Sequence, residues 1–224
     1  RAVETDVHTR SRAPDLLVDA LLLEARAMFL AGQVAAARPN LEAALTLARE
    51  RQYIRGEYNA LAQLGLLHWH TGDYHAAATL MELALEQIRQ AGDVRRELDI
   101  LNNLGIVART RAQYLAALGY YEQAQKIARK ISDRAGEATL LANMGDVSLT
   151  SGDFVQAGVY SKQAAAMAAE VNEPTLQGIA LINQGEAYRE LGQYDRALDT
   201  AVQALTLVRS KGYRRGEATV LWNT

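Results

Sequence analysis

Apolar residues recur along the chain at steps of three and four residues, in runs of helical length separated by short polar turns. In one such run Leu61, Leu64 and Leu67 fall on one face of a helix, because these steps follow the helical period of about 3.6 residues. A turn is expected at Gly72, since glycine accepts the left-handed conformation that ends a helix, and Asp73 can cap the next helix. A second apolar run follows this turn. No stretch shows the sustained alternation of a strand, so the pattern predicts an all-α fold of paired helices.

The helix pair recurs at a fixed interval, so that the same residue types return at every fortieth position. Residues forty positions apart share a phase of the repeat. Glycine, alanine and leucine each occupy one such phase, as Gly65, Gly105, Gly145 and Gly185; Ala37, Ala77, Ala117, Ala157 and Ala197; and Leu21, Leu61, Leu101, Leu141, Leu181 and Leu221. Because a single pair cannot bury its apolar face alone, the units must stack into a solenoid. We expect ten full helices and part of an eleventh in one solenoid over residues 14–224, after an N-terminal extension at residues 1–13. Its units are 14–53, 54–93, 94–133, 134–173 and 174–213, with a partial sixth at 214–224.

Small residues in fixed phases indicate where helices cross closely. Gly65 and Ala77 are expected to face each other within one helix pair, because small side chains let two helix axes approach. The first unit departs from the pattern. Ala25 stands one period before Gly65, Val34 stands one period before the aromatic Tyr74, and Pro39 falls inside the second helix. Proline removes a backbone hydrogen bond, so it should kink that helix or delay its start.

The composition excludes several kinds of protein. The chain holds 224 residues, of which 49% are hydrophobic and 22% charged, and this balance excludes a disordered or fibrous chain. The formal net charge of −2 offers no basic field for nucleic acid or an anionic membrane. No apolar run reaches the roughly 18 residues of a membrane span. With no cysteine and no apolar signal core near its start, the chain is expected to be a cytoplasmic protein or a piece of one.

No motif of catalysis, cofactor binding or metal binding stands out. The sequence lacks the glycine-rich loops that cradle phosphates and the His-Glu-x-x-His pattern of zinc enzymes. His68, His70 and His75 gather around one turn, but the first two are two residues apart on a helix and so point to different faces. Asp146 and Glu186 are better explained by ion pairs with nearby arginines than by acid–base catalysis. We therefore expect a protein that is not an enzyme and that holds no cofactor or metal.

The phased residues resemble those of a known family. The resemblance is to the tetratricopeptide repeat, and it rests on Leu61-x-x-Leu64-Gly65-x-x-His68 and Gly72-Asp73-Tyr74-x-x-Ala77, then Met81 and Ala84. The usual unit of that family has about 34 residues. The unit of this chain is longer, and its linking sequence Arg55-Gly56-Glu57 is similar to the longer repeats of kinesin light chain. Similar long repeats form the sensor arms of bacterial nucleotide-switch regulators and the peptide receptors of quorum sensing. The resemblance implies a right-handed α-solenoid of antiparallel helix pairs, with the first helix of each pair on the concave wall.

One carboxamide side chain per unit recurs in the same first-helix phase. The set is Gln63, Asn103, Asn143, Asn183 and Asn223. A carboxamide both donates and accepts hydrogen bonds, as the backbone of an extended peptide does, and in tetratricopeptide families that bind such peptides an asparagine in this phase contacts the ligand backbone. The alternative is that these side chains bond one another or the adjacent helix. The sequence leaves both interpretations open.

The neighbouring inner-wall positions vary, as expected of a specificity surface. The groove should be apolar and aromatic in one part and of mixed charge in another, at Leu66 and Trp69 and at Arg109, Asp146, Glu186 and Arg189 respectively. The residues of the clamp that binds acidic chaperone tails have no counterpart here. The resemblance implies a scaffold that binds a protein or extended peptide in this groove. The alternative is a sensor arm of a larger regulator, acting on a nucleotide-binding or DNA-binding domain of the same full-length chain.

Two surface features complete the expectations. Leu221 and Trp222 belong to a first helix whose covering second helix would be missing, so this end should leave apolar surface open for self-association. Arginines in one phase at the helix starts are expected to form solvated ion pairs with glutamates two positions later, namely Arg55, Arg95 and Arg215 with Glu57, Glu97 and Glu217.

Overall fold

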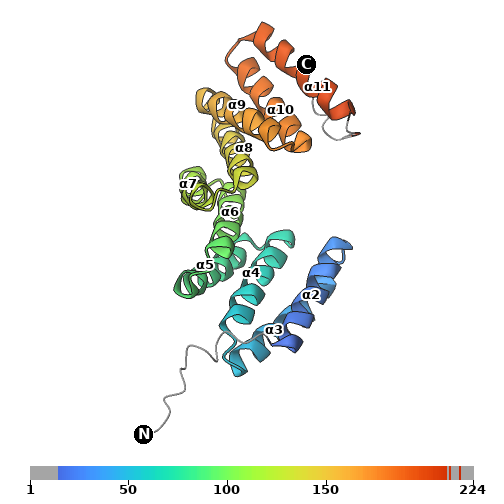
Figure 1. Cartoon of the computed structure of the whole chain (residues 1–224), viewed down its shortest axis with the longest axis vertical. Helices are drawn as coiled ribbons and strands as arrows, with labels where there is room; N and C mark the ends of the chain where they lie inside the picture. Colours follow the sequence, from blue (N-terminus) through green and yellow to red (C-terminus); the bar gives the residue numbers. More distant parts are fainter. Residues whose placement is uncertain (1–14, 211, 213–216, 218–224) are drawn as a thin grey trace. The chain divides into compact units, whose positions relative to one another are not determined.

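The computed structural model describes residues 15–210, Gly212 and Glu217, and in this part of the chain it has ten α-helices and one short 3₁₀ helix but no strand (Figure 1). In chain order the elements are α2 (Leu16–Leu30), the 3₁₀ helix η1 (Val34–Ala37), α3 (Arg38–Glu50), α4 (Ile54–His70), α5 (Tyr74–Ala91), α6 (Val94–Thr110), α7 (Tyr114–Lys130), α8 (Arg134–Ser151), α9 (Phe154–Glu170), α10 (Pro174–Glu190) and α11 (Tyr194–Ser210). The predicted all-α fold is confirmed. The expected partial eleventh helix, with Leu221 and Trp222, lies outside the described residues apart from Glu217.

The helices follow the repeat period without slippage. From α4 onward the helix starts are evenly spaced, as at Ile54, Tyr74 and Val94, so each helix pair occupies one full period of the sequence. Aspartate side chains cap four of these starts, at Asp73, Asp93, Asp133 and Asp153. At the first of them, Oδ1 accepts a hydrogen bond from the Ala76 N–H at 3.0 Å. The cap expected after the Gly72 turn is therefore confirmed.

Every turn between the described helices places one residue in the left-handed conformation. These residues recur at even intervals from Gly32 to Gly212, and six of them are glycines with φ between 67° and 87°. The other four have φ between 54° and 58°, at Gln52, Ala112, Ser132 and Asn172. Only glycine adopts this conformation without steric strain. The turn geometry is thus shared by all the repeats, including those whose sequence does not suit it.

The first repeat accommodates Pro39 by delaying its second helix. The 3₁₀ turn η1 takes the preceding residues, and α3 begins at Arg38 with the proline within its first two positions. Proline fits there because its missing N–H would have no intrahelical partner in any case. Pro174 occupies the equivalent place at the start of α10. Of the two expected outcomes, a kink or a delayed start, the structure shows the delayed start.

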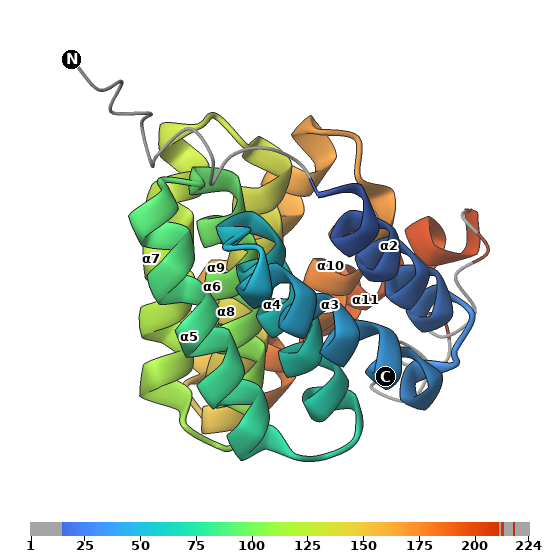
Figure 2. The same ribbon diagram turned by 90° about the horizontal axis from the view of Figure 1, so that it is seen from below.

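The described helices form two compact units, which divide between Arg111 and Ala112. In the first unit α2 packs against α3 and α4, while α5 packs against α4 and α6. In the second unit α8 packs against α7 and α9, and α10 contacts α8, α9 and α11 (Figure 2). The first helices α4, α8 and α10 each contact their own second helix and at least one helix of the preceding pair, as stacking repeats do. The single solenoid over residues 14–224 stays a prediction.

Close helix crossings explain the phased glycines. A methyl group on Gly65 would lie 2.7 Å from Met81 Cγ and 3.2 Å from the Ala77 carbonyl oxygen. A methyl group on Gly145 of α8 would lie 2.5 Å from the Oγ atom of Ser161 in α9. Both separations are shorter than an ordinary van der Waals contact of about 3.5–4.0 Å between carbon atoms. The structure therefore confirms that Gly65 and Ala77 face each other across one helix pair.

Candidate functional site

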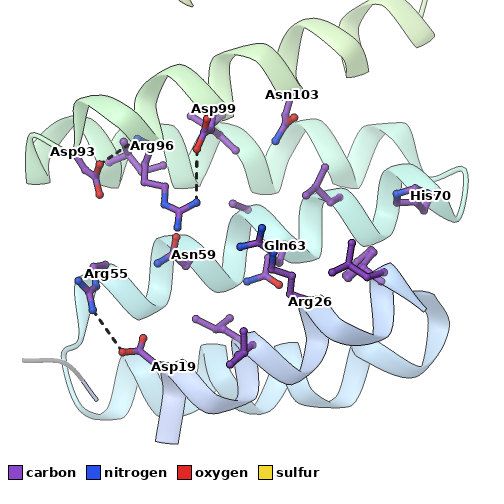
Figure 3. Close-up of a pocket in the computed structure, with 18 residues that line it drawn as sticks. Asp19, Arg26, Arg55, Asn59, Gln63, His70, Asp93, Arg96, Asp99 and Asn103 are labelled. Carbon is purple, nitrogen blue, oxygen red and sulfur yellow. Dashed lines mark hydrogen bonds and ion pairs between the residues drawn. The ribbon is translucent and has the colours of Figure 1, made fainter. Parts of the chain in front are cut away.

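The first helices of the first unit form a groove. It has a volume of about 770 Å³ and is lined mainly by residues of α2, α4 and α6 (Figure 3). The repeat turns the same helix face toward it from each of the three helices, since Leu23, Gln63 and Asn103 stand in one phase of the repeat and all line it. The wall of this groove is thus built from successive first helices.

Carboxamide side chains occupy the middle of the groove. Gln63 and Asn103 line it together with Asn59, one helical turn before Gln63 (Figure 3). The Oε1 atom of Gln63 is buried and accepts no hydrogen bond from the described residues. An acceptor in this state is destabilised by about 1–3 kcal/mol relative to a bonded one. An unsatisfied acceptor is therefore buried in the wall of the groove, on a residue that lies beside two further amide groups.

The other predicted carboxamides lie away from this groove. Asn143 of α8 and Asn183 of α10 belong to the second unit, where both are partly buried. Asn143 already interacts with other residues of the protein. Asn223 lies outside the described residues. Of the five carboxamides, the structure thus brings Gln63 and Asn103 into one groove.

One end of the groove is apolar and aromatic. Leu66 and His70 of α4 line it with Phe29 of α2, and the rings of Phe29 and His70 lie 5.8 Å apart. Trp69 adjoins this end, because its ring meets His70 edge-on at 4.8 Å, while its Nε1 donates a hydrogen bond to Thr110 Oγ1 at 3.3 Å. This end can therefore receive an apolar or aromatic side chain.

The opposite end of the groove is charged (Figure 3). Arg55 NH2 lies 3.5 Å from Asp19 Oδ2, and Tyr53 OH donates a hydrogen bond to Oδ1 of the same carboxylate at 3.1 Å. Arg96 NH1 lies 3.7 Å from Asp99 Oδ2. The hydrogen bond to the Tyr53 hydroxyl raises the pKa of Arg55, and burial raises the pKa of Tyr53. Both groups therefore keep their protons at neutral pH, and the charges at this end are held in place.

A buried tyrosine supports the charged end from behind. The Tyr58 hydroxyl donates a hydrogen bond to Asp93 Oδ2 at 2.8 Å, while Oδ1 of the same carboxylate caps α6 by accepting from the Arg96 N–H at 3.1 Å. Burial raises the pKa of Tyr58 far above its usual value, so this donor also stays protonated. Arg26, which lines the groove from α2, makes no ion pair with the described residues.

The mixed-charge residues expected on the inner wall are divided between the two units. Arg109 belongs to α6 and Asp146 to α8, and both are partly buried. Glu186 and Arg189 line a smaller cavity of about 410 Å³ between α10 and α11. Arg189 NH2 lies 2.8 Å from Oε1 of its neighbour Glu190. Glu186 and Arg189 thus share one cavity, and neither Arg109 nor Asp146 lines it.

The glutamates at the helix starts pair with arginines eight residues earlier in the sequence. The pairs are Arg49–Glu57, Arg89–Glu97, Arg129–Glu137 and Arg209–Glu217, with N–O distances of 3.0, 2.7, 2.6 and 2.7 Å. The expectation that Arg55 pairs with Glu57 is wrong, because Arg55 binds Asp19 and Tyr53 instead. An arginine in the last turn of a second helix reaches the start of the next first helix more directly. Arg215 lies outside the described residues.

The histidines near the Gly72 turn make ordinary contacts. His68 Nδ1 lies 3.4 Å from Asp73 Oδ2, and its Nε2 lies 3.5 Å from Arg38 NH1. In the part of the chain that the structure describes, no group of three or more histidine, aspartate or glutamate side chains is placed to hold a metal ion. No helix in that part is long and apolar enough to cross a membrane.

Several groove residues were not selected from the sequence. Asp19 and Arg26 come from the atypical first unit, yet they stand one period before Asn59 and Leu66. The inner-wall phases, when continued back into the first unit, therefore predict that Asp19 and Arg26 line the groove. The pairing of Asp19 with Arg55 has no such signal, because the two partners stand in different phases and lie far apart in the sequence.

Comparisons with known proteins find helical repeat proteins. The family model of the tetratricopeptide repeat matches residues 57–130 and 136–210. The crystal structure of BtubC (BKLC) from P. vanneervenii is similar over 88% of this chain and 81% of that one, with 23% identity and a TM-score of 0.79. The TPR-like repeats of a Podosopora anserina putative kinesin light chain match over 86% of this chain and 96% of that one, with 17% identity and a TM-score of 0.72.

A third similar structure belongs to a larger signalling protein. It is a signal transduction ATPase with numerous domains and a tetratricopeptide repeat sensor, from Pyrococcus horikoshii. The similarity covers 95% of this chain but 37% of that one, with 14% identity and a TM-score of 0.76. A comparison with curated protein sequences found no match.

Proposed function

The chain belongs to the tetratricopeptide repeat family, and from this premise we propose that it is a non-enzymatic scaffold that holds an extended peptide segment of a partner protein in the groove of α2, α4 and α6. Such a peptide presents side chains and alternating backbone donors and acceptors along its length. The groove offers an apolar end, a charged end and amide groups between them, so it complements both kinds of feature. Its volume of about 770 Å³ suits a ligand of several residues.

The unsatisfied Gln63 Oε1 atom carries this proposal. A buried acceptor is normally bonded, and this one has no donor among the described residues. A backbone N–H of a bound peptide would supply the missing hydrogen bond when the Gln63 side chain turns its Oε1 atom toward the groove. Asn103, which lines the groove on the neighbouring first helix, can donate to a peptide carbonyl and accept from an N–H.

The carboxamides have an alternative role, which is to join adjacent repeats. The observations count against this role for Gln63 in the first unit and are compatible with it for Asn143 in the second. If Gln63 joined α4 to a neighbouring repeat through Oε1, this atom would be bonded to a described residue in the unliganded protein, and it is not. Asn143 of the second unit does interact with other residues of the protein. The ligand-binding role is therefore proposed for Gln63 and Asn103.

A peptide-display experiment tests the proposal. Random peptides displayed on phage are selected on the wild-type chain, and individual binders are then measured against Leu66→Glu, which places a charge at the apolar end of the groove. We expect binding to fall at least tenfold, because the apolar anchor loses its site. The matched control is Leu115→Glu, since Leu115 of α7 is exposed and lies outside the groove. Selection of no binder, or equal binding to both variants, would contradict the proposal.

A second candidate function is a sensor arm of a larger regulator. It is favoured by the similarity to the repeat sensor of the Pyrococcus horikoshii protein, which extends well beyond the part that this chain matches. The coding sequence on either side of this segment discriminates between the candidates, since a phosphate-binding loop or a helix-turn-helix in the same reading frame would favour the sensor. In either case the groove receives the ligand. The cytoplasmic location expected from the sequence stays a prediction.

A further inference from the structure

An apolar stripe runs along the whole of α2 on the side away from the core. Its residues follow alternating steps of four and three, and all of them are exposed: Leu16, Ala20, Leu23, Ala27 and Leu30. The three leucines expose 82%, 67% and 84% of their surface, although the opposite side of the helix is buried. This spacing averages about 3.5 residues and is typical of the contact line between paired helices. We call these five residues the α2 seam.

The corresponding residues of the next first helix are buried. Ala60 and Leu67 of α4 stand one period after Ala20 and Ala27, and both belong to a core cluster with residues of α2 and α3. These two phases therefore face the preceding helix pair. Among the described elements, α2 contacts η1, α3 and α4, and none of them covers the α2 seam.

Two leucines of the α2 seam, Leu23 and Leu30, stand where other first helices are polar. One period after Leu23 and Leu30 come Gln63 and His70, and the later repeats hold asparagine in the first phase and threonine or glutamate in the second. A preceding helix pair would cover the two alanines and leave these leucines in water. Exposed leucines over the full length of a helix indicate that the partner is another apolar helix face.

The α2 seam is complementary to itself. From either end its order is Leu-Ala-Leu-Ala-Leu, centred on Leu23, so a second copy running in the opposite direction offers a matching surface. Asp19 and Arg26 flank the seam seven residues apart on one side. An antiparallel copy sets Arg26, which makes no ion pair with the described residues of its own chain, beside Asp19 of its partner, whose carboxylate also contacts Arg55 within its own chain.

We propose that two copies of this chain associate through antiparallel pairing of their α2 helices, with Leu23 of each copy at the two-fold axis. A helix of 15 residues is about 22 Å long, so one such pair buries less than the roughly 1,200 Å² of a small standard interface. The association is therefore weak and depends on protein concentration. It does not depend on peptide binding, although Leu23, Arg26 and Leu30 also line the groove.

Single cysteines test the direction of the pairing, because the chain has none of its own. Leu23→Cys should form a disulfide-linked dimer on mild oxidation, since the two-fold axis brings this position close to itself and a disulfide needs Cα atoms within about 7 Å. Leu16→Cys and Leu30→Cys should stay monomeric alone and form a mixed dimer when combined. Self-linking of Leu16→Cys would show a parallel pair and overturn the proposal. Leu115→Cys, at an exposed leucine of α7, is the control and should stay monomeric.

Sedimentation measurements test the association itself. The average mass of the wild-type chain should rise toward that of a dimer as its concentration increases, and Leu23→Glu should abolish this rise while the helical circular dichroism stays unchanged. Leu198→Glu, at an exposed leucine of α11, should associate as the wild type does. A wild-type chain that is monomeric at every concentration would overturn the proposal. Dissociation by Leu198→Glu but not by Leu23→Glu would also overturn it, because the contact would then run through the other end of the chain.

Discussion

Two glycines in the same phase of the repeat should respond differently to replacement by alanine. Gly145 of α8 and Gly185 of α10 both lie in the interior of a first helix, where alanine is favoured over glycine by about 1 kcal/mol. A methyl group on Gly145 would lie 2.5 Å from the Oγ atom of Ser161, whose side chain is fully buried. A methyl group on Gly185 would have its nearest neighbour, the Ala197 carbonyl oxygen, at 3.6 Å.

The magnitudes follow from these contacts. Gly185→Ala should stabilise the protein by about 0.5–1 kcal/mol, since the methyl group fits and only helix propensity changes. Gly145→Ala gains the same propensity but overpacks the crossing with α9 by about 1–3 kcal/mol, so it should be neutral or destabilising by up to about 2 kcal/mol. The two variants should therefore differ by about 1–3 kcal/mol in the free energy of unfolding.

Urea unfolding followed by far-ultraviolet circular dichroism measures this difference. Gly119→Ala supplies the baseline, because Gly119 lies within α7 and a methyl group there would meet no neighbour within 4 Å. It should match Gly185→Ala. Equal stabilisation by all three variants would refute the reasoning, since helix propensity alone would then explain them and α8 and α9 would not cross closely at Gly145.

Three further predictions concern packing, turns and caps. Ala157→Leu should destabilise the protein by about 1–3 kcal/mol, because Ala157 is fully buried in α9, and an unchanged melting temperature would contradict this. Gln52→Gly should raise stability by about 0.5–1 kcal/mol by relieving the left-handed conformation, whereas Gly152→Ala, at φ 84°, should lower the melting temperature. The hydrogen bond from the Ala76 N–H holds the pKa of Asp73 below its usual 3.8, so the stability from this cap is complete above that pH and is lost as the pH falls further. Asp73→Asn should flatten this part of a plot of melting temperature against pH.

The regular part of the fold could be predicted from the sequence because each signal is local. The phased glycines and aspartates mark where helices end and begin, and Pro39 marks the one delayed helix among those described. The left-handed turn at Gln52 has no such local signal, because glutamine rarely takes this conformation. It becomes visible only when Gln52 is compared with the turns at Gly32 and Gly72, which stand at equal distances on either side of it.

The site was less predictable because it depends on side chains from different repeats. Gln63 and Asn103 were selected by their shared phase, and both line the groove. The Asp19–Arg55 pair was not selected, since its partners stand in different phases and meet only after α2 packs against α4. A phase identifies which helix face a residue occupies, but not which residue of another repeat lies opposite it.

Calorimetric titration of a selected peptide into two glutamine variants tests the central claim most directly. Gln63 and Gln87 each have a buried Oε1 atom without a donor among the described residues, but Gln63 lines the groove and Gln87 lies on α5 outside it. Gln63→Ala should weaken binding by about 0.5–1.5 kcal/mol, which corresponds to about a twofold to tenfold rise in Kd. Gln87→Ala should bind as the wild type does. Wild-type affinity in Gln63→Ala, with an intact melting temperature, would contradict the claim that this groove holds the backbone of a peptide.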